Sequence, residues 1–260
     1  MTDTITRVGR ALLALAVVLG VASGRTADAE PAEEKAEALA IAERMATFLA
    51  QAPRFSFVLE SSYDVVQADG RELEFGAIRR VAVRRPDRLR VDEVRRDGAQ
   101  RGQVFDGREI RAFDLDANVY AVDPRQGTLK EVIDYMVDDL GMRFPLNEMI
   151  TGELVEGLAS ARGALLVGEE RIGDATCDHV AARGFGVDLQ LWVQQGNEPL
   201  LRRAVVTYTE AAGRPQFRAD LSDWNLDPEL PESVFAFAPP DGAERIPFAA
   251  AARAAGAGSP

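Results

Sequence analysis

The stretch RFSFVLESSYDVVQADGRELEFGAIRRVAV, residues 54–83, decides the fold of this chain. Apolar residues recur at alternate positions on both sides of Asp69-Gly70, a dipeptide typical of a tight hairpin turn. Because alternate residues of a strand point to the same side of a sheet, this stretch predicts an antiparallel hairpin with one apolar face. That face carries Phe55, Phe57, Leu59, Tyr63, Val65, Leu73, Phe75, Ala77, Val81 and Val83.

The same pattern of strands and tight turns continues along the chain. Asp97-Gly98 and Asp106-Gly107 repeat the turn signal, so residues 54–122 predict an antiparallel meander of about six strands. Five more strands are predicted near residues 165–170, 175–183, 188–193, 201–209 and 215–224. An antiparallel sheet of this size has to curl, and one of its faces needs a cover.

Three segments have the 3.6-residue apolar period of amphipathic helices and can supply that cover. They are residues 33–49, residues 128–140 and, more weakly, residues 145–158. The second segment places Ile133, Met136, Val137 and Leu140 on one side. The predicted fold class is therefore mainly β with α. One domain spans residues 30–246 and contains a helical insertion at about 128–158.

The N-terminal segment predicts export. Arg7 and Arg10 precede the apolar run of residues 11–22, and Ala27-Asp28-Ala29 follows as a cleavage site, which together are typical of a secretory signal peptide over residues 1–29. The apolar run is shorter than the roughly 20 residues of a membrane span, so no span is expected in the mature chain. Residues 247–260 have no apolar period and predict a disordered tail.

Composition restricts the classes of partner. The formal net charge of −12 argues against nonspecific binding to nucleic acid or to anionic lipid surfaces, since both are driven by positive charge. Cys177 is the only cysteine, so an exported chain of this kind has no internal disulfide. Its stability is expected to come from its apolar core.

The only cysteine and the only histidine lie two residues apart in Cys177-Asp178-His179. A metal site needs three or four ligands, and a nucleophilic pair needs an activated thiolate and an oxyanion hole; neither set is visible in the sequence. A buried thiol beside a hydrogen-bonded histidine is the favoured interpretation. With no other nucleophile, metal or cofactor motif, the sequence predicts a protein that is not an enzyme and that has no catalytic residue, metal or cofactor.

The arginine-rich stretch VAVRRPDRLRVDEVRRDG, residues 81–98, needs a separate interpretation. Its arginines alternate with valine and leucine, as in a strand with one solvated face, and nearby carboxylates offset the charge. Most of these arginines are therefore expected to be solvated, and Pro86 marks the start or edge of a strand.

Several of these stretches together resemble the periplasmic lipoprotein-carrier proteins, the LolA-like superfamily. The resemblance lies in RRPDRLRVDEV, in FDGREIRAFDLDANVYAV and in the closing ESVFAFAPPDGAERI. The C-terminal half, GDATCDHVAARGFGVDLQLWVQQGNEPLLRRAVVTY with PQFRADLSDW, is similar to a branch of predicted periplasmic proteins of unknown function. The resemblance implies a half-barrel of about eleven strands with lid helices in its concave side. It also implies that Arg85, before the proline, binds the lid-helix backbone.

The resemblance and the residues together predict a periplasmic binding or carrier protein for a hydrophobic or lipid-linked ligand. The ligand would lie between the curved sheet and the lid helices, with Arg85 as the latch of the lid. Cavity lining is expected from Phe55, Phe57, Leu59, Tyr63 and Phe75, although the same aromatics also fit an ordinary core. The alternative is an envelope sensor or regulatory protein that uses the same half-barrel to bind a lipoprotein or another envelope protein.

Overall fold

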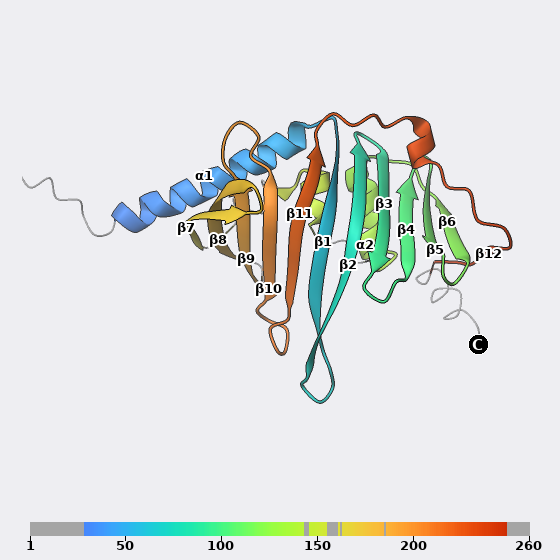
Figure 1. Cartoon of the computed structure of the whole chain (residues 1–260), viewed down its shortest axis with the longest axis horizontal. Helices are drawn as coiled ribbons and strands as arrows, with labels where there is room; N and C mark the ends of the chain where they lie inside the picture. Colours follow the sequence, from blue (N-terminus) through green and yellow to red (C-terminus); the bar gives the residue numbers. More distant parts are fainter. Residues whose placement is uncertain (1–28, 143–145, 155–160, 162, 185, 249–260) are drawn as a thin grey trace, which may run out of the picture.

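The computed structural model describes residues 29–142, 146–154, 161, 163–184 and 186–248. Within them, twelve strands form one sheet in the order β12-β6-β5-β4-β3-β2-β1-β11-β10-β9-β8-β7. Neighbouring strands are antiparallel, except that β12 runs parallel to β6. The two end strands, β12 and β7, are not paired with each other, so the curved sheet stays open (Figure 1). This architecture confirms the predicted fold class.

The strands of the first half are β1 (Arg54–Val66), β2 (Glu72–Arg84), β3 (Arg88–Arg95), β4 (Gln100–Phe105), β5 (Glu109–Asp114) and β6 (Val119–Pro124). Those of the second half are β7 (Gly163–Ile172), β8 (Ala175–Gly184), β9 (Val187–Gln194), β10 (Leu201–Tyr208), β11 (Gln216–Asn225) and β12 (Glu244–Arg245). The helices are α1 (Ala29–Gln51), α2 (Leu129–Asp138), α3 (Asn147–Thr151) and the short 3-10 helix η1 (Glu232–Phe235).

The predicted hairpin is formed by β1 and β2 at the centre of the sheet. Phe55 pairs with Val83 and Phe57 with Val81, which keeps the apolar residues of both strands on one face. Gly70, in the Asp-Gly turn, has φ = +83°, a left-handed conformation that glycine adopts without strain. The hairpin projects beyond the neighbouring strands at its turn end (Figure 1).

The helices cover the concave face of the sheet. α1 buries one stripe of side chains in the core, and α2 begins with a capping box in which Thr128 and Glu131 satisfy each other's backbone N–H groups. The stripe of α1 consists of Ala38, Ile41, Ala42, Met45, Ala46 and Leu49. α3 is shorter than the helix predicted over residues 145–158, because it ends at Gly152, where φ is +87°.

A second cover lies on the convex face. After β11, the chain crosses the end of the neighbouring strands to η1 and continues to β12 beside β6 (Figure 1). Phe235 packs against Val104 and Phe113, and the rings of Phe113 and Phe237 stack with centroids 4.3 Å apart. β12 is the strand beyond the eleven predicted from the sequence; it is only two residues long, too short for its periodicity to be recognised.

Several sequence-based predictions lie outside the described residues. They include residues 1–28 of the predicted signal peptide, residues 155–158 of the third predicted helix and residues 249–260 of the tail. Within the described residues, no helix is both long enough and apolar enough to cross a membrane.

The fold makes a prediction about two phenylalanines of the central hairpin. Phe55 is 1% exposed in the core, so Phe55→Ala should lower the free energy of unfolding by about 3–5 kcal/mol. Phe75 is 38% exposed, and Phe75→Ala should cost only about 1 kcal/mol, chiefly through its ring contact with Tyr63. Urea denaturation measures both. Equal losses would contradict the placement of the core.

Candidate ligand site on the concave face

The floor of the candidate site is an aromatic and aliphatic surface on β1, β2 and β3. Phe55, Phe57 and Leu59 are all at most 5% exposed. The ring of Phe57 stacks on Trp224 of β11 at 4.6 Å and lies 6.2 Å from Phe55. These three predicted lining residues therefore form one continuous apolar surface.

The roof of the site consists of α2 and α3. Ile133, Met136 and Leu140 are buried against the floor, and Val137 is partly buried beside them. α3 adds Met149 and Ile150 to the same core. The predicted lid residues thus face the predicted floor, and helix side chains occupy the concave face.

Tyr63 and Phe75 lie farther along the hairpin than the other predicted lining residues. Their ring centroids lie 5.9 Å apart. Tyr63 pairs with Phe217 of β11 and packs against the edge of the apolar core, whereas Phe75 lies beyond the last β2 residue that pairs with β3. A polar group lies between Phe75 and the floor: the guanidinium of Arg79 donates to Ser61 at 2.7 Å and pairs with Glu93 at 2.5 Å. The apolar face of the hairpin is therefore interrupted, and the structure does not bring Phe75 into the buried floor.

Arg85 connects the sheet to two helices. Its Nη1 donates to the carbonyl of Ile150 in α3 at 2.6 Å, and its Nε donates to the carbonyl of Ala52 just after α1 at 3.1 Å. Its Nη2 lies 3.5 Å from the carbonyl of Leu49, and the guanidinium lies 5.7 Å from the centre of the Phe55 ring. Burial lowers the pKa of Arg85. A guanidinium that is partly removed from water needs hydrogen-bond acceptors, and the carbonyls of Leu49 and Ala52 at the C-terminal end of α1 supply two of them.

Other polar contacts hold α2 at its N-terminal end and centre. The Leu129 N–H donates to the carbonyl of Pro86 at 2.7 Å, and the Tyr135 hydroxyl donates to Asp123 at 2.5 Å. The guanidinium of Arg125 lies 3.5 Å above the Tyr135 ring. Lys130 joins α2 to the second residue after α3 through an ion pair with Glu153 at 2.6 Å.

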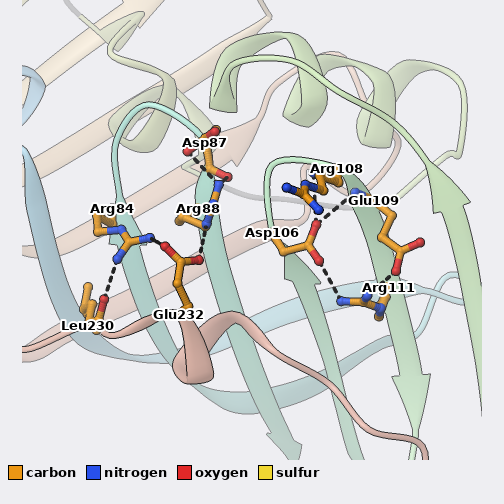
Figure 2. Close-up of polar contacts among 9 residues, drawn as sticks. All are labelled: Arg84, Asp87, Arg88, Asp106, Arg108, Glu109, Arg111, Leu230 and Glu232. Carbon is orange, nitrogen blue, oxygen red and sulfur yellow. Dashed lines mark hydrogen bonds and ion pairs between the residues drawn. The ribbon is translucent and has the colours of Figure 1, made fainter.

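On the opposite face, the C-terminal segment is clamped by three arginines of the arginine-rich stretch. Figure 2 shows Arg84 and Arg88 converging on the carboxylate of Glu232, while Arg84 also donates to the carbonyl of Leu230 at 2.7 Å. Arg90 donates to the carbonyl of Val234 at 3.1 Å. The pKa of Glu232 is lowered, first by the hydrogen bond from Arg84 and then by that from Arg88.

A turn beside this clamp is fixed by Asp106, also drawn in Figure 2. Its carboxylate accepts the backbone N–H groups of Arg108 and Glu109, each at 3.0 Å, and pairs with Arg111. Burial tends to raise the pKa of Asp106, but these donors outweigh it and lower the pKa. Gly107 has φ = +84° and passes so close to Arg88 that a Cβ atom there would collide with the guanidinium.

Cys177 and His179 face away from the helices and form a separate cluster. His179 stacks on Trp192 with ring centroids 4.0 Å apart, and both rings bind the carboxylate of Glu170 at 3.0 Å. Cys177 has no exposed surface, and burial raises the pKa of its thiol. In the part of the chain that the structure describes, no three His, Cys, Asp or Glu side chains form a potential metal site. The burial of Cys177 and the hydrogen bonds of His179 fit the favoured interpretation, a buried thiol beside a hydrogen-bonded histidine.

A sequence profile of the family described as "Predicted periplasmic protein (DUF2092)" matches residues 38–249. The chain belongs to this family. The match confirms the predicted branch and, through the family's description, the periplasmic location. The open sheet with helices on its concave face is the architecture that the resemblance to LolA-like proteins implied. No curated protein matches the sequence of this chain.

Solved structures with a similar fold differ widely in sequence. The lipoprotein LppX of Mycobacterium tuberculosis is 14% identical, with 74% of this chain and 99% of that chain covered and a TM-score of 0.47. LprF of Mycobacterium bovis is 11% identical, with 75% and 96% covered and a TM-score of 0.49. A LolA superfamily protein of Nitrosomonas europaea is 15% identical, with 77% and 97% covered and a TM-score of 0.39. What this DUF2092 protein binds therefore has to be argued from its own side chains.

The expectation that most arginines of residues 81–98 are solvated is wrong for the three that contact the C-terminal segment. Arg84, Arg88 and Arg90 share the convex face because they occupy alternate strand positions, and there they meet the C-terminal segment. Their partners lie 144 to 148 residues away along the chain. The only signal in the sequence is that arginines recur on one strand face, opposite a closing segment that contains a glutamate.

The clamp predicts a pH dependence in this DUF2092 protein. Because the folded pKa of Glu232 lies below its ordinary value of 4.5, its stabilising effect is fully present above that value and is lost as the pH falls through the lowered pKa. Between about pH 5 and pH 2, the free energy of unfolding should therefore fall less steeply in Glu232→Gln than in the wild type. Glu229→Gln, an exposed carboxylate of the same segment, should keep the wild-type slope. Urea denaturation at several pH values measures this, and identical slopes for all three proteins would contradict the clamp.

Proposed function

We propose that this protein binds a hydrophobic or lipid-linked ligand in the periplasm, between the apolar floor and the helices α2 and α3. The observation that carries the proposal is the position of Arg85. One partly buried guanidinium above an aromatic floor donates to backbone carbonyls at the end of α1 and in α3. Such a contact can close a lid and can be exchanged for water when the lid opens.

The energetics suit a reversible latch. A hydrogen bond to a charged group contributes about 1.5–3 kcal/mol when the alternative is an unpaired buried group. In the open state, both the guanidinium and the helix-end carbonyls would be hydrated, so the loss on opening would be small compared with that of breaking a packed core. Arg85 would thus favour the closed state without making opening prohibitive.

The contacts of the two helices point to α3 as the part that moves. α2 is fixed by its capping box, by its backbone bond to Pro86 and by Tyr135. α3 spans only residues 147–151. Among the described residues, the bond from Arg85 links it to the sheet, and the Lys130–Glu153 ion pair links its C-terminal end to α2. Release of Arg85 would uncover the floor below Met149 and Ile150 while α2 keeps its anchor.

An acyl or other aliphatic chain is the ligand class that fits this surface. Burying one methylene group contributes about 0.8 kcal/mol, so a chain of several methylenes could replace the helix side chains that leave the floor. The net charge of −12 disfavours attraction to anionic membrane surfaces, which is consistent with a ligand taken up from a carrier or from solution.

The latch predicts the effect of replacing Arg85. In Arg85→Ala, backbone amide exchange within α3 should be at least about tenfold faster, equivalent to ~1.4 kcal/mol, because the Ile150 carbonyl loses its donor. Arg85→Lys should be intermediate, since a lysine cannot present several fixed donors at once. Arg108→Ala removes an exposed arginine and should leave exchange unchanged. Hydrogen–deuterium exchange with mass spectrometry measures all three. Unchanged exchange in Arg85→Ala would contradict the latch.

Ligand binding is tested directly on protein purified from its native periplasm. Extraction and mass spectrometry should identify a co-purifying lipid, and the delipidated protein should bind the neutral probe N-phenyl-1-naphthylamine with a rise in fluorescence. Arg85→Ala should bind this probe faster than Arg108→Ala does. If no lipid co-purifies and neither the wild type nor Arg85→Ala binds the probe or a fluorescent fatty acid, the proposed function is refuted.

A further inference from the structure

A hollow lies on the convex face, on the side of the sheet opposite the proposed ligand. Apolar and small residues of β1 and β2 line it together with one residue of the C-terminal segment: Ser56, Phe57, Val58, Val81, Ala82 and Val234. Four charged residues complete the lining: Arg80, Arg90, Asp92 and Asp223. Ser56 and Ala82 are direct partners across β1 and β2, so two short side chains meet where the hollow lies.

Arg80 and Asp223 carry charges that the described part of the chain does not pair. Both are exposed, and neither side chain has a hydrogen bond or an ion pair with another described residue. The neighbouring Arg90 and Asp92, by contrast, form a two-point ion pair with distances of 2.7 and 2.9 Å. Arg80 is on β2 and Asp223 on β11, with β1 between them, so two strand spacings separate them by about 10 Å. The hollow therefore has a free cation on one side and a free anion on the other.

The backbone around Asp223 is irregular in a way that distinguishes this place from the rest of β11. The register between β1 and β11 shifts between Ser56 and Val58, and Asp223 has φ = +51°. A non-glycine residue in this region costs on the order of 1–3 kcal/mol, and such bulges redirect side chains at binding sites. Aspartate is among the residues that adopt this conformation most readily.

Exposed apolar side chains extend the hollow on the β2 and β3 side. Ile78 is 41% exposed and Val94 is 38% exposed, and the two are direct partners across the strands. Ile78 lies two residues from Arg80 and therefore on the same face. The carboxylate of Glu60 is exposed opposite Ile78 across β1 and β2, outside the hollow. The hollow itself has two unpaired charges of opposite sign, Arg80 and Asp223, beside this apolar pair.

We propose that this hollow docks an extended segment of a partner protein that carries an aliphatic residue between an acidic and a basic residue. The aliphatic side chain would lie over Val58 and Ala82, its acidic neighbour would pair with Arg80, and its basic neighbour would pair with Asp223. A simple anion would be attracted by Arg80 and repelled by Asp223, and a simple cation would be attracted by Asp223 and repelled by Arg80. Only an occupant with both signs satisfies both sides.

The spacing of an extended chain fits this arrangement. Residues i, i+2 and i+4 of a strand lie on one face and span about 13 Å, and long acidic and basic side chains can converge on charges about 10 Å apart. The order of the two charges along the segment is left free, since the segment can run in either direction across β1.

Three short peptides test the proposal with the full mature protein labelled with nitrogen-15. The probes are the acetylated, amidated sequences Glu-Ser-Leu-Ser-Lys, Lys-Ser-Leu-Ser-Lys and Glu-Ser-Leu-Ser-Glu. The first should bind the wild type best and should shift the amide signals of residues 56–58, 80–82 and 222–224. Equal affinity for all three peptides, or shifts confined to other residues, would overturn the proposal.

Charge reversal makes the test specific. Arg80→Glu leaves two unpaired anions beside the hollow. It should therefore lower the affinity for Glu-Ser-Leu-Ser-Lys (the Glu/Lys peptide) at least tenfold and make Lys-Ser-Leu-Ser-Lys (the Lys/Lys peptide) the preferred one. Arg80→Glu combined with Asp223→Lys should restore the Glu/Lys preference, and Arg108→Glu is the matched surface control that should change nothing. If Arg80→Glu keeps the wild-type preference, or if sedimentation shows a dimer that Arg80→Glu abolishes, the assignment to a partner segment is overturned. These outcomes are independent of whether the concave face binds a lipid.

Discussion

Two consecutive arginines hold the two covers of the sheet. Arg84 and Arg85 follow each other at the end of β2, where strand alternation sends successive side chains to opposite faces. Arg84 binds Leu230 and Glu232 of the C-terminal segment, and Arg85 binds the ends of α1 and α3. The open sheet cannot bury both faces with its own side chains, so each face depends on a segment brought in from elsewhere in the chain. This strand end is where both segments are fixed.

The sequence predicted the elements well because their signals are local. The alternation over residues 54–83 and the Asp-Gly turns depend on a few neighbouring residues, and so do the amphipathic stripes of α1 and α2. The role of Arg84, Arg88 and Arg90 was missed because it depends on pairing with residues more than 140 positions away. Periodicity shows which face a side chain occupies, but it contains no information about what the other end of the chain brings to that face.

In the candidate site too, the local signals were read correctly and the contacts with distant segments were not. Phe55, Phe57 and Leu59 were correctly assigned to one apolar face, and so were the facing residues of α2. Tyr63 and Phe75 obey the same alternation, yet Tyr63 is only partly buried at the edge of the core, and Phe75 is exposed beyond the Arg79–Glu93 pair. The extent of a cover along a strand depends on helix length and position, which the pattern of the strand does not contain. The convex hollow depends on a shift of register between β1 and β11, which simple alternation does not reveal either.

The proposed ligand binding places two conflicting demands on the concave face. Without a ligand, its aromatic floor must be buried, or the exposed apolar surface would promote aggregation. With a ligand, the same floor must become available at low cost. A helix that forms a continuous part of the core would meet the first demand and not the second. A short helix such as α3, with few side chains in the core and a partly buried arginine as its polar link to the sheet, meets both. The energy needed to open the site is then determined mainly by Arg85 and the few apolar contacts of α3, while α2 and the sheet keep the fold intact. Under this proposal, a ligand would have to outweigh only the contacts of α3, and the length of its apolar chain would determine whether it does.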